Sequence, residues 1–155
     1  MAAGEGAFPV KKPEGPGEAR ARLAAYAERF HLENPWAKFF NVRVEDMGPG
    51  HARLVLPFRA EYTHGLRVVQ GGVITSVADA AIAHAIMPML DPGHACTTVE
   101  LKINFLAPVT REDMVAEARV VRKGRQIVLG EADVKSPEGR HFARALATYL
   151  IISSA

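Results

Sequence analysis

A single carboxylate in a strongly apolar segment is the first candidate for chemistry. Asp79 lies near the middle of residues 73–87, which are otherwise apolar or small apart from two hydroxyl residues and a histidine. Burying a carboxylate costs free energy unless it has a partner or a function. A structural role, bonded to a backbone N–H or paired across a subunit interface, and a catalytic role are both open at this point.

Two glycines before the same segment favour the catalytic role. Gly71 lies eight residues before Asp79, and Gly72 follows it where the chain turns into the predicted helix. The first N–H groups of a helix have no partner within it, so they can hold negative charge that develops on a carbonyl oxygen. Glycine there lets a substrate carbonyl approach the backbone closely. The glycine pair, the apolar helix and the acid together indicate a catalytic site for a carbonyl substrate.

The spacing of apolar residues predicts the helices that position this site. Residues 18–34 are rich in Ala, Arg and Glu and carry apolar residues at helical spacing, which predicts an outer helix that ends at Pro35. Residues 73–87 are apolar nearly all round, which is typical of a helix in the middle of a domain, and Pro88 closes it. Residues 1–17 contain many glycines and prolines and few large apolar side chains, so we expect a flexible tail.

A period of two predicts strands around the central helix. From residue 41 apolar and polar residues alternate on both sides of a Gly48-Pro49-Gly50 turn, and Pro57 limits the second strand because it cannot donate to a ladder. Four more strands are predicted after the helix, at residues 97–105, 115–122, 126–134 and 141–152. In the first of these, one face is expected to carry Thr97, Val99, Leu101, Ile103 and Phe105.

This order of elements predicts an α+β domain over residues 18–155. An antiparallel sheet wrapped around one long central helix is the economical way to bury that helix, and the N-terminal helix is an addition outside it. We find no internal repeat and no second domain.

Composition and charge exclude several classes of protein and partner. Hydrophobic residues make up 48% of the chain and charged residues 23%, which is usual for a globular domain. The formal charge of +2 is too small to indicate a nucleic-acid partner. Cys96 is the single cysteine, which excludes an intrachain disulfide, and the histidines show no metal-ligand spacing. No apolar run approaches the roughly 20 residues of a membrane span, so we expect no membrane partner and a cytoplasmic protein.

Three short motifs make the chain recognisable. The segments His64-Gly65, Gln70-Gly71-Gly72-Val73-Ile74 and Ala78-Asp79-Ala80-Ala81 resemble the hotdog-fold acyl-CoA thioesterases of the phenylacetate-pathway (PaaI-type) family, and residues 97–106 resemble that family's strand after the helix. The similarity covers residues 35–152. It implies a hotdog fold and hydrolysis of acyl-CoA to a free acid and CoA, without a cofactor because CoA is part of the substrate. It also implies a homodimer or homotetramer with its sites at the interface, where Asp79 would face Gly71 and His64 of the neighbouring chain.

The resemblance assigns roles to five positions. Asp79 matches the catalytic acid, which acts either as general base on water or as nucleophile, and Gly71 matches the residue whose N–H polarises the thioester carbonyl. Thr97 matches a hydroxyl-bearing position that helps to place the water. The chain departs from the family at Gln70, where His is frequent, and at His64, where Asn or Gln is usual. Both replacements can still donate a hydrogen bond.

A basic turn is the candidate site for the nucleotide end of CoA. Arg122, Lys123, Gly124 and Arg125 lie between two predicted strands, and Arg and Lys bind phosphate well. An ordinary charged hairpin turn is the alternative. Two other functions also stay open: a hotdog enoyl-CoA hydratase or dehydratase, which pairs a histidine with the helix acid, and a noncatalytic acyl-CoA-binding protein. The glycine pair is evidence against the hydratase.

Overall fold

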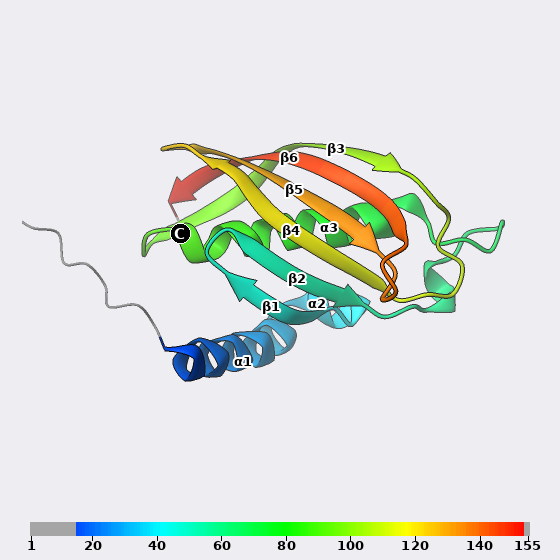
Figure 1. Cartoon of the computed structure of the whole chain (residues 1–155), viewed down its shortest axis with the longest axis horizontal. Coiled ribbons are helices and arrows are strands. Elements are labelled where there is room, and N and C mark those ends of the chain that lie inside the picture. The colour runs from blue at the N-terminus through cyan, green and yellow to red at the C-terminus, as the bar shows by residue number, and fades with distance from the viewer. Residues whose placement is uncertain (1–14, 154–155) are drawn as a thin grey trace, which may run out of the picture.

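The apolar segment forms the central helix α3 (Gly71–Ile86), which lies along one face of a curved sheet (Figure 1). The helix begins two residues before the predicted start because the side-chain oxygen of Gln70 accepts the N–H of Gly72 as an N-cap. It continues into the short 3₁₀ turn η2 (Met87–Met89). Contrary to the expectation that no apolar run approaches a membrane span, Gly71–Met89 is long and apolar enough to cross a membrane by length and composition alone. Its buried residues instead form part of the protein core: Ile74, Val77, Ala78, Ala81, Ile82, His84, Ala85 and Ile86.

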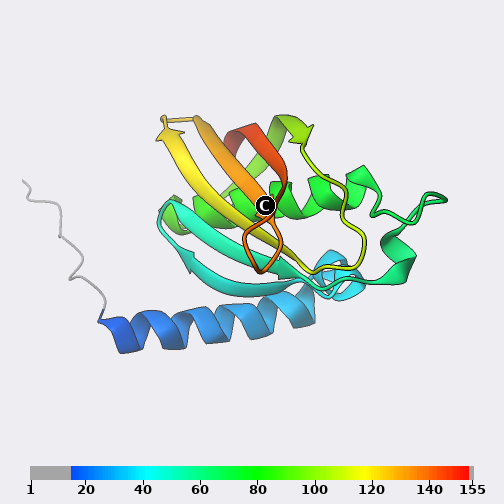
Figure 2. The ribbon, with the colours of Figure 1, turned by 45° about the vertical axis from the view of Figure 1, so that its right-hand side comes forward.

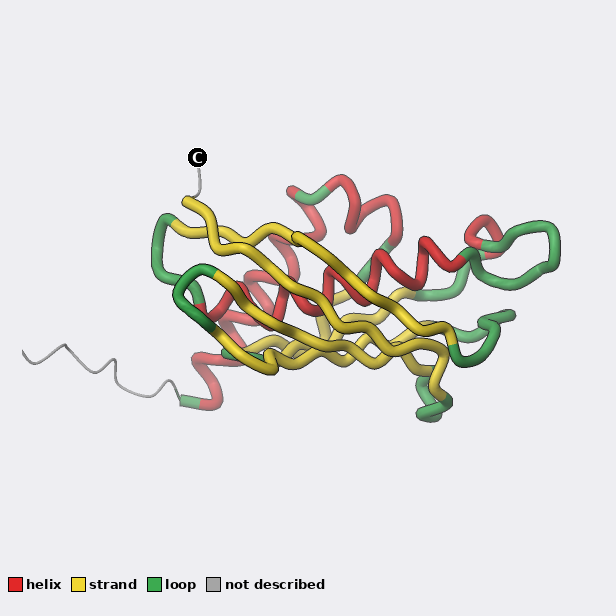
Figure 3. Tube along the Cα trace, turned by 90° about the horizontal axis from the view of Figure 1, so that it is seen from above, coloured by secondary structure: helices red, strands yellow, loops and turns green. Residues whose placement is uncertain are grey.

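Six antiparallel strands cover this helix in the order β1-β2-β4-β5-β6-β3. Their bounds are Arg43–Gly48 (β1), His51–Leu56 (β2), His94–Phe105 (β3), Met114–Lys123 (β4), Ile127–Lys135 (β5) and His141–Ser153 (β6). Seen from above, the strands form one layer and most helical turns lie on one side of it (Figure 3). The structure, a computed structural model, describes residues 15–153. It confirms the predicted α+β class and the sheet around one long helix.

The two faces of the sheet differ in chemistry, as the period of two predicted. The inner face is apolar and packs on α3; a Cβ on Gly130 would overlap the side chain of Ile82. The outer face carries ion pairs between neighbouring strands: Glu117 of β4 binds both Arg53 of β2 and Lys135 of β5. β2 ends at Leu56, just before the proline that was expected to limit it.

Strand β3 departs from the predicted alternation. Its pairing with β6 shifts register between Thr98 and Glu100, so Val99 is an extra residue in the strand. Thr98 lies opposite Tyr149 and Leu101 lies opposite Ala147, and both of these β6 residues are buried. Thr98 therefore faces α3 together with Leu101. The expectation that Thr97 and Val99 share the face of Leu101 is wrong, because one extra residue inverts the faces of a strand.

Two helices precede the sheet. The predicted outer helix is α1 (Pro16–Glu33), which lies beside β1 on the outside of the domain (Figure 2). It begins two residues earlier than predicted, since proline suits the first turn of a helix. The remainder of the predicted tail, residues 1–14, lies outside the described residues. A short helix that the sequence did not predict, α2 (Pro35–Phe40), follows at once, because the side chain of Asn34 caps it by accepting the N–H of Ala37 at 3.1 Å.

Packing between α1 and α3 centres on a buried histidine. The ring centroid of His84 lies 4.7 Å from that of Phe30 and 5.8 Å from that of Tyr26, both on α1. Its Nδ1 is 2.6 Å from the carbonyl oxygen of Ala80, whereas Nε2 is buried without a hydrogen-bond partner among the described residues. Burial lowers the pKa of His84 below its ordinary 6.5, so the ring is neutral in the folded protein.

Stability is therefore expected to fall in mild acid. Below pH 6.5 the unfolded chain binds a proton at this histidine that the folded chain resists, so the free energy of unfolding decreases by up to about 1.4 kcal/mol per pH unit until the folded pKa is reached. His84→Leu should remove this part of the pH dependence. Urea unfolding at pH 7.5, 6.5 and 5.5 measures it for both proteins. Equal pH dependence in the two would show that His84 does not carry the effect.

Candidate active site

Asp79 is held by hydroxyl groups from two strands. Thr98 of β3 donates its Oγ1 hydrogen to Asp79 Oδ1 at 2.9 Å, and the hydroxyl of Tyr149 of β6 lies 2.6 Å from the same oxygen. The Tyr149 hydroxyl is also 2.7 Å from the backbone carbonyl oxygen of Asp79. The described residues offer no partner to Oδ2, and the carboxylate is only partly buried. One oxygen is thus fixed in place while the other is free to accept a proton or to attack a carbonyl carbon.

Tyr149 was missed by the sequence analysis. It lies 70 residues from Asp79, and only the pairing of β6 beside β3 brings it to the helix. Burial and the neighbouring Asp79 carboxylate raise the pKa of Tyr149, which keeps its hydroxyl protonated as a donor. A signal was present: a tyrosine within an otherwise apolar inner strand needs a partner for its hydroxyl.

Removing this hydroxyl tests its part in positioning Asp79. Tyr149→Phe is expected to lower kcat about 10- to 100-fold, which matches the loss of one hydrogen bond to a charged group. KM should change little, because the tyrosine hydroxyl is bonded to Asp79 and acts through it. Steady-state kinetics of the thioester hydrolysis that the resemblance implies separate the two constants. A normal kcat, or a loss confined to KM, would contradict the positioning role.

Gly71 presents a free backbone donor at the start of α3. Its N–H has no acceptor among the described residues, whereas the N–H of Gly72 is bonded to the Gln70 side chain and the N–H of Val73 to the Gln70 carbonyl oxygen. A Cβ at Gly71 would lie 3.0 Å from the ring of Phe105, so the backbone is closely approached there. Gly71 lines a hollow of about 390 Å³ at the end of β3. Its free N–H is suited to polarising a carbonyl oxygen.

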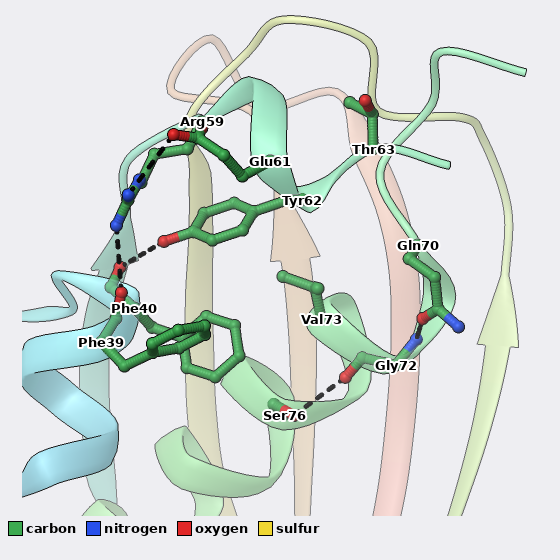
Figure 4. A pocket seen from close by; sticks show the side chains of 10 residues that line it. All are labelled: Phe39, Phe40, Arg59, Glu61, Tyr62, Thr63, Gln70, Gly72, Val73 and Ser76. Atoms are coloured by element: carbon green, nitrogen blue, oxygen red, sulfur yellow. Dashed lines mark hydrogen bonds and ion pairs between the residues drawn. The ribbon is translucent and has the colours of Figure 1, made fainter. Parts of the chain in front are cut away.

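The two other predicted hydrogen-bond donors, Gln70 and His64, lie near Gly71 at the start of α3. The oxygen of the Gln70 carboxamide serves as the helix cap, and its nitrogen points away from the helix (Figure 4). His64 is exposed on a loop that a bridge between Thr63 and Val69 closes. Its Nδ1 accepts the N–H of Leu66 at 3.2 Å. Gln70 and His64 are therefore near the start of α3 and not near its middle.

The structure does not bring the two halves of the predicted site together in one chain. Eight residues at 1.5 Å each separate Gly71 from Asp79 by about 12 Å along α3. The hydroxyl beside Asp79 is that of Thr98, one residue beyond the predicted Thr97, which is exposed on the other face. The difference follows from the extra residue at Val99.

The basic turn lies at the Asp79 end of the sheet. Arg122 and Lys123 end β4, Arg125 follows Gly124, and all three basic side chains are exposed. Ile127, just after the turn, pairs with Leu150, which in turn pairs with Thr97. Phosphate binding by this turn stays a prediction. Within residues 15–153 there is no group of three or more His, Cys, Asp or Glu side chains that could hold a metal ion.

Comparison with known proteins identifies the family. The profile of the thioesterase superfamily matches residues 66–143. A protein of Saccharolobus solfataricus assigned as an esterase is 31% identical over 130 residues, which cover 84% of this chain and 92% of that protein. A second protein assigned as an esterase, from Halobacterium salinarum, is 30% identical, and the alignment covers 77% of this chain and 80% of that protein.

Solved structures of known proteins have the same fold as this chain. A thioesterase family protein from Silicibacter pomeroyi superposes with a TM-score of 0.77 at 25% identity, over 85% of this chain and 99% of that one. The Escherichia coli PaaI protein from the phenylacetic acid degradation operon superposes with the same TM-score at 21% identity, over 88% of this chain and 98% of its own. The profile match and the relatives together show that this chain belongs to the thioesterase superfamily and has the hotdog fold.

Proposed function

We propose that this protein hydrolyses acyl-CoA thioesters to a free acid and CoA, at a site that two copies of the chain complete, and that within the superfamily it is PaaI-type. The observation that carries the proposal is the division of the site along α3. Asp79 is oriented by Thr98 and Tyr149, and the unbonded N–H of Gly71 lies about 12 Å away. A nucleophile or base and an oxyanion donor must reach the same carbonyl group, so the two must come from different chains.

The free edge of the sheet supports pairing of two chains. β3 is the last strand in the sheet order, and an unpaired edge of 12 residues is a template for another strand. Two residues of β3 lie beside the two halves of the site: Thr98 is bonded to Asp79, and the Phe105 ring lies beside Gly71. A two-fold axis between Leu101 and Lys102 pairs Thr98 of one chain with Phe105 of the other. Asp79 of one chain then faces Gly71 of its neighbour, twice per homodimer. A homotetramer would repeat this dimer.

The proposed chemistry follows from the N–H of Gly71 and the carboxylate of Asp79. The thioester carbonyl oxygen accepts the N–H of Gly71, which stabilises negative charge in the transition state. Asp79 Oδ2 then either takes a proton from the attacking water or attacks the carbonyl carbon to give a mixed anhydride that water cleaves. In both routes the C–S bond breaks, the acyl carbon gains a hydroxyl oxygen from water, and CoA leaves as the thiol. Arg122, Lys123 and Arg125 supply positive charge for the phosphates of CoA. A cytoplasmic location is part of this proposal.

The hydratase alternative has less support in this geometry. A hydratase would need an imidazole that transfers a proton to carbon. His64 lies on an exposed loop and its Nδ1 already accepts the N–H of Leu66. Within the described residues Asp79 is hydrogen-bonded to Thr98 and Tyr149 and to no histidine.

A panel of acyl-CoA esters tests the proposal directly. The parent protein is incubated with acetyl-, octanoyl- and phenylacetyl-CoA, and release of free thiol is followed with a chromogenic thiol reagent. Hydration of crotonyl-CoA is followed in parallel by loss of the enoyl absorbance. Thiol release without hydration is expected. Hydration without thiol release would assign the hydratase function, and tight acyl-CoA binding with neither activity would assign a binding protein.

A further inference from the structure

A cavity of about 480 Å³ lies beside the first two turns of α3, and Asp79, Thr98, Tyr149 and the basic turn do not line it (Figure 4). Its walls come from three elements: the end of α2, the 3₁₀ turn η1 (Ala60–Tyr62) and the start of α3. The α2 and η1 sides carry Phe39, Phe40 and Tyr62, and the α3 side carries Gly72, Val73 and Ser76. The volume is in the range of small-molecule sites.

The aromatic walls are held in place by hydrogen bonds. The hydroxyl of Tyr62 donates to the carbonyl oxygen of Phe40 at 2.8 Å, and Arg59 Nη1 donates to the carbonyl oxygen of Phe39 at 3.1 Å. The Phe40 ring packs on Tyr62 with centroids 5.5 Å apart and on Phe39 at 5.0 Å. The end of α2 is thereby fastened to η1, so the cavity is formed before any ligand enters. A preformed cavity loses less conformational entropy on binding.

The polar groups that line the cavity are already paired, apart from the carboxamide nitrogen of Gln70, which has no hydrogen-bond partner among the described residues. The Ser76 hydroxyl donates to the carbonyl oxygen of Gly72 at 2.9 Å, and Thr63 Oγ1 donates to the carbonyl oxygen of Ala60 at 2.7 Å. The guanidinium of Arg59 lies 3.5 Å from the Glu61 carboxylate. The two charged side chains that line the cavity are thus paired with each other. The cavity therefore suits an uncharged apolar group such as an aryl ring or a medium-length alkyl chain.

The cavity is next to the free N–H of Gly71. Gly71 and Gly72 are consecutive in the first turn of α3; the first faces Phe105, and the second lines the cavity. Neither carries a side chain, and the carboxamide of Gln70, which caps Gly72, is the side chain that an acyl group would pass between the two. We propose that the cavity receives the acyl group of a substrate whose carbonyl is held by the Gly71 N–H, and that it selects aryl or medium-chain acyl groups over acetyl. This inference rests on the proposed thioesterase function.

Filling the cavity tests the inference. Val73→Phe places a ring in it from α3, and is expected to lower kcat/KM for octanoyl- and phenylacetyl-CoA at least about tenfold relative to acetyl-CoA, mainly through KM. Phe39→Ala removes a wall side chain that is 68% exposed, so folding should be unaffected. It should change the octanoyl-to-acetyl ratio of kcat/KM about threefold or more. Leu66→Ala, on an 81% exposed residue outside the cavity, is the matched control and should leave the ratio unchanged.

The outcomes separate this inference from the function on which it rests. If the parent releases no thiol from any acyl-CoA, the thioesterase proposal fails. If the parent is active but both cavity variants keep the parental ratios, or lose activity equally on acetyl-CoA, the cavity does not bind the acyl group. Circular dichroism establishes that each variant is folded, and should Val73→Phe not fold, the ratio measured for Phe39→Ala decides.

Discussion

Asp79→Asn is expected to lower the rate of thioester hydrolysis by at least about a hundredfold, and more if the carboxylate is the nucleophile. Asparagine keeps the volume of the side chain and its Oδ1, so Thr98 and Tyr149 can still donate to it. It loses the second carboxylate oxygen, which has no partner among the described residues and is the atom available for chemistry. The fold should therefore survive while the reaction does not.

The measurement combines kcat from thiol release with a thermal melt. Asp91→Asn makes the same chemical change at an exposed residue in the turn before β3, and should retain the parental rate. An Asp79→Asn protein that is folded and hydrolyses acyl-CoA at near the parental rate would remove Asp79 from the mechanism. A melt that falls far below that of the parent would instead indicate that the carboxylate is structural.

Mixing two inactive variants should restore activity if each site spans two chains. Gly71→Pro removes the free N–H at the first position of α3, where proline is well tolerated, and Gln70 already has an extended backbone (φ −62°, ψ 133°) that suits a following proline. Loss of one oxyanion donor is expected to lower kcat about 10²- to 10³-fold. A mixed dimer of Gly71→Pro with Asp79→Asn has one site with Asp79 and Gly71 both intact. Random assortment then gives about a quarter of the parental activity.

Gly71→Ala is the matched control for this experiment. Its Cβ meets the Phe105 ring at the same 3.0 Å as that of proline, but its N–H remains, so the difference between the two variants measures the replacement of the N–H by the ring methylene of proline and leaves out the effect of the Cβ. The variants are unfolded together and refolded as a mixture, and light scattering gives the assembly. If the sites lay within single chains, every site in a mixed dimer would carry one substitution and no activity would return. A stable active monomer would also contradict the shared site.

Much of the fold could be predicted because burial leaves a local pattern. The period of two indicated β1, β2 and β3, strand-like runs between turn residues indicated the other three strands, and the continuous apolar segment indicated α3, since these patterns depend on which face of an element meets the core. The short helix α2 was not predicted, because its sequence signal is an N-cap at Asn34 that comes directly after the end of another helix. Asp79 and Gly71 stood out for a local reason too: a carboxylate in an apolar helix and glycines at a helix start are unusual without a function.

The sequence by itself determined which groups carry the proposed chemistry and how far apart they are. Once residues 71–86 are helical, the rise per residue alone separates Gly71 from Asp79 by about 12 Å. Tertiary structure decided which side chains orient the carboxylate. Thr98 and not Thr97 meets Asp79 because of one extra residue at Val99, and Tyr149 meets it because β6 lies beside β3. Such contacts depend on cross-strand register over many residues, and a shift of one residue exchanges the two faces of a strand.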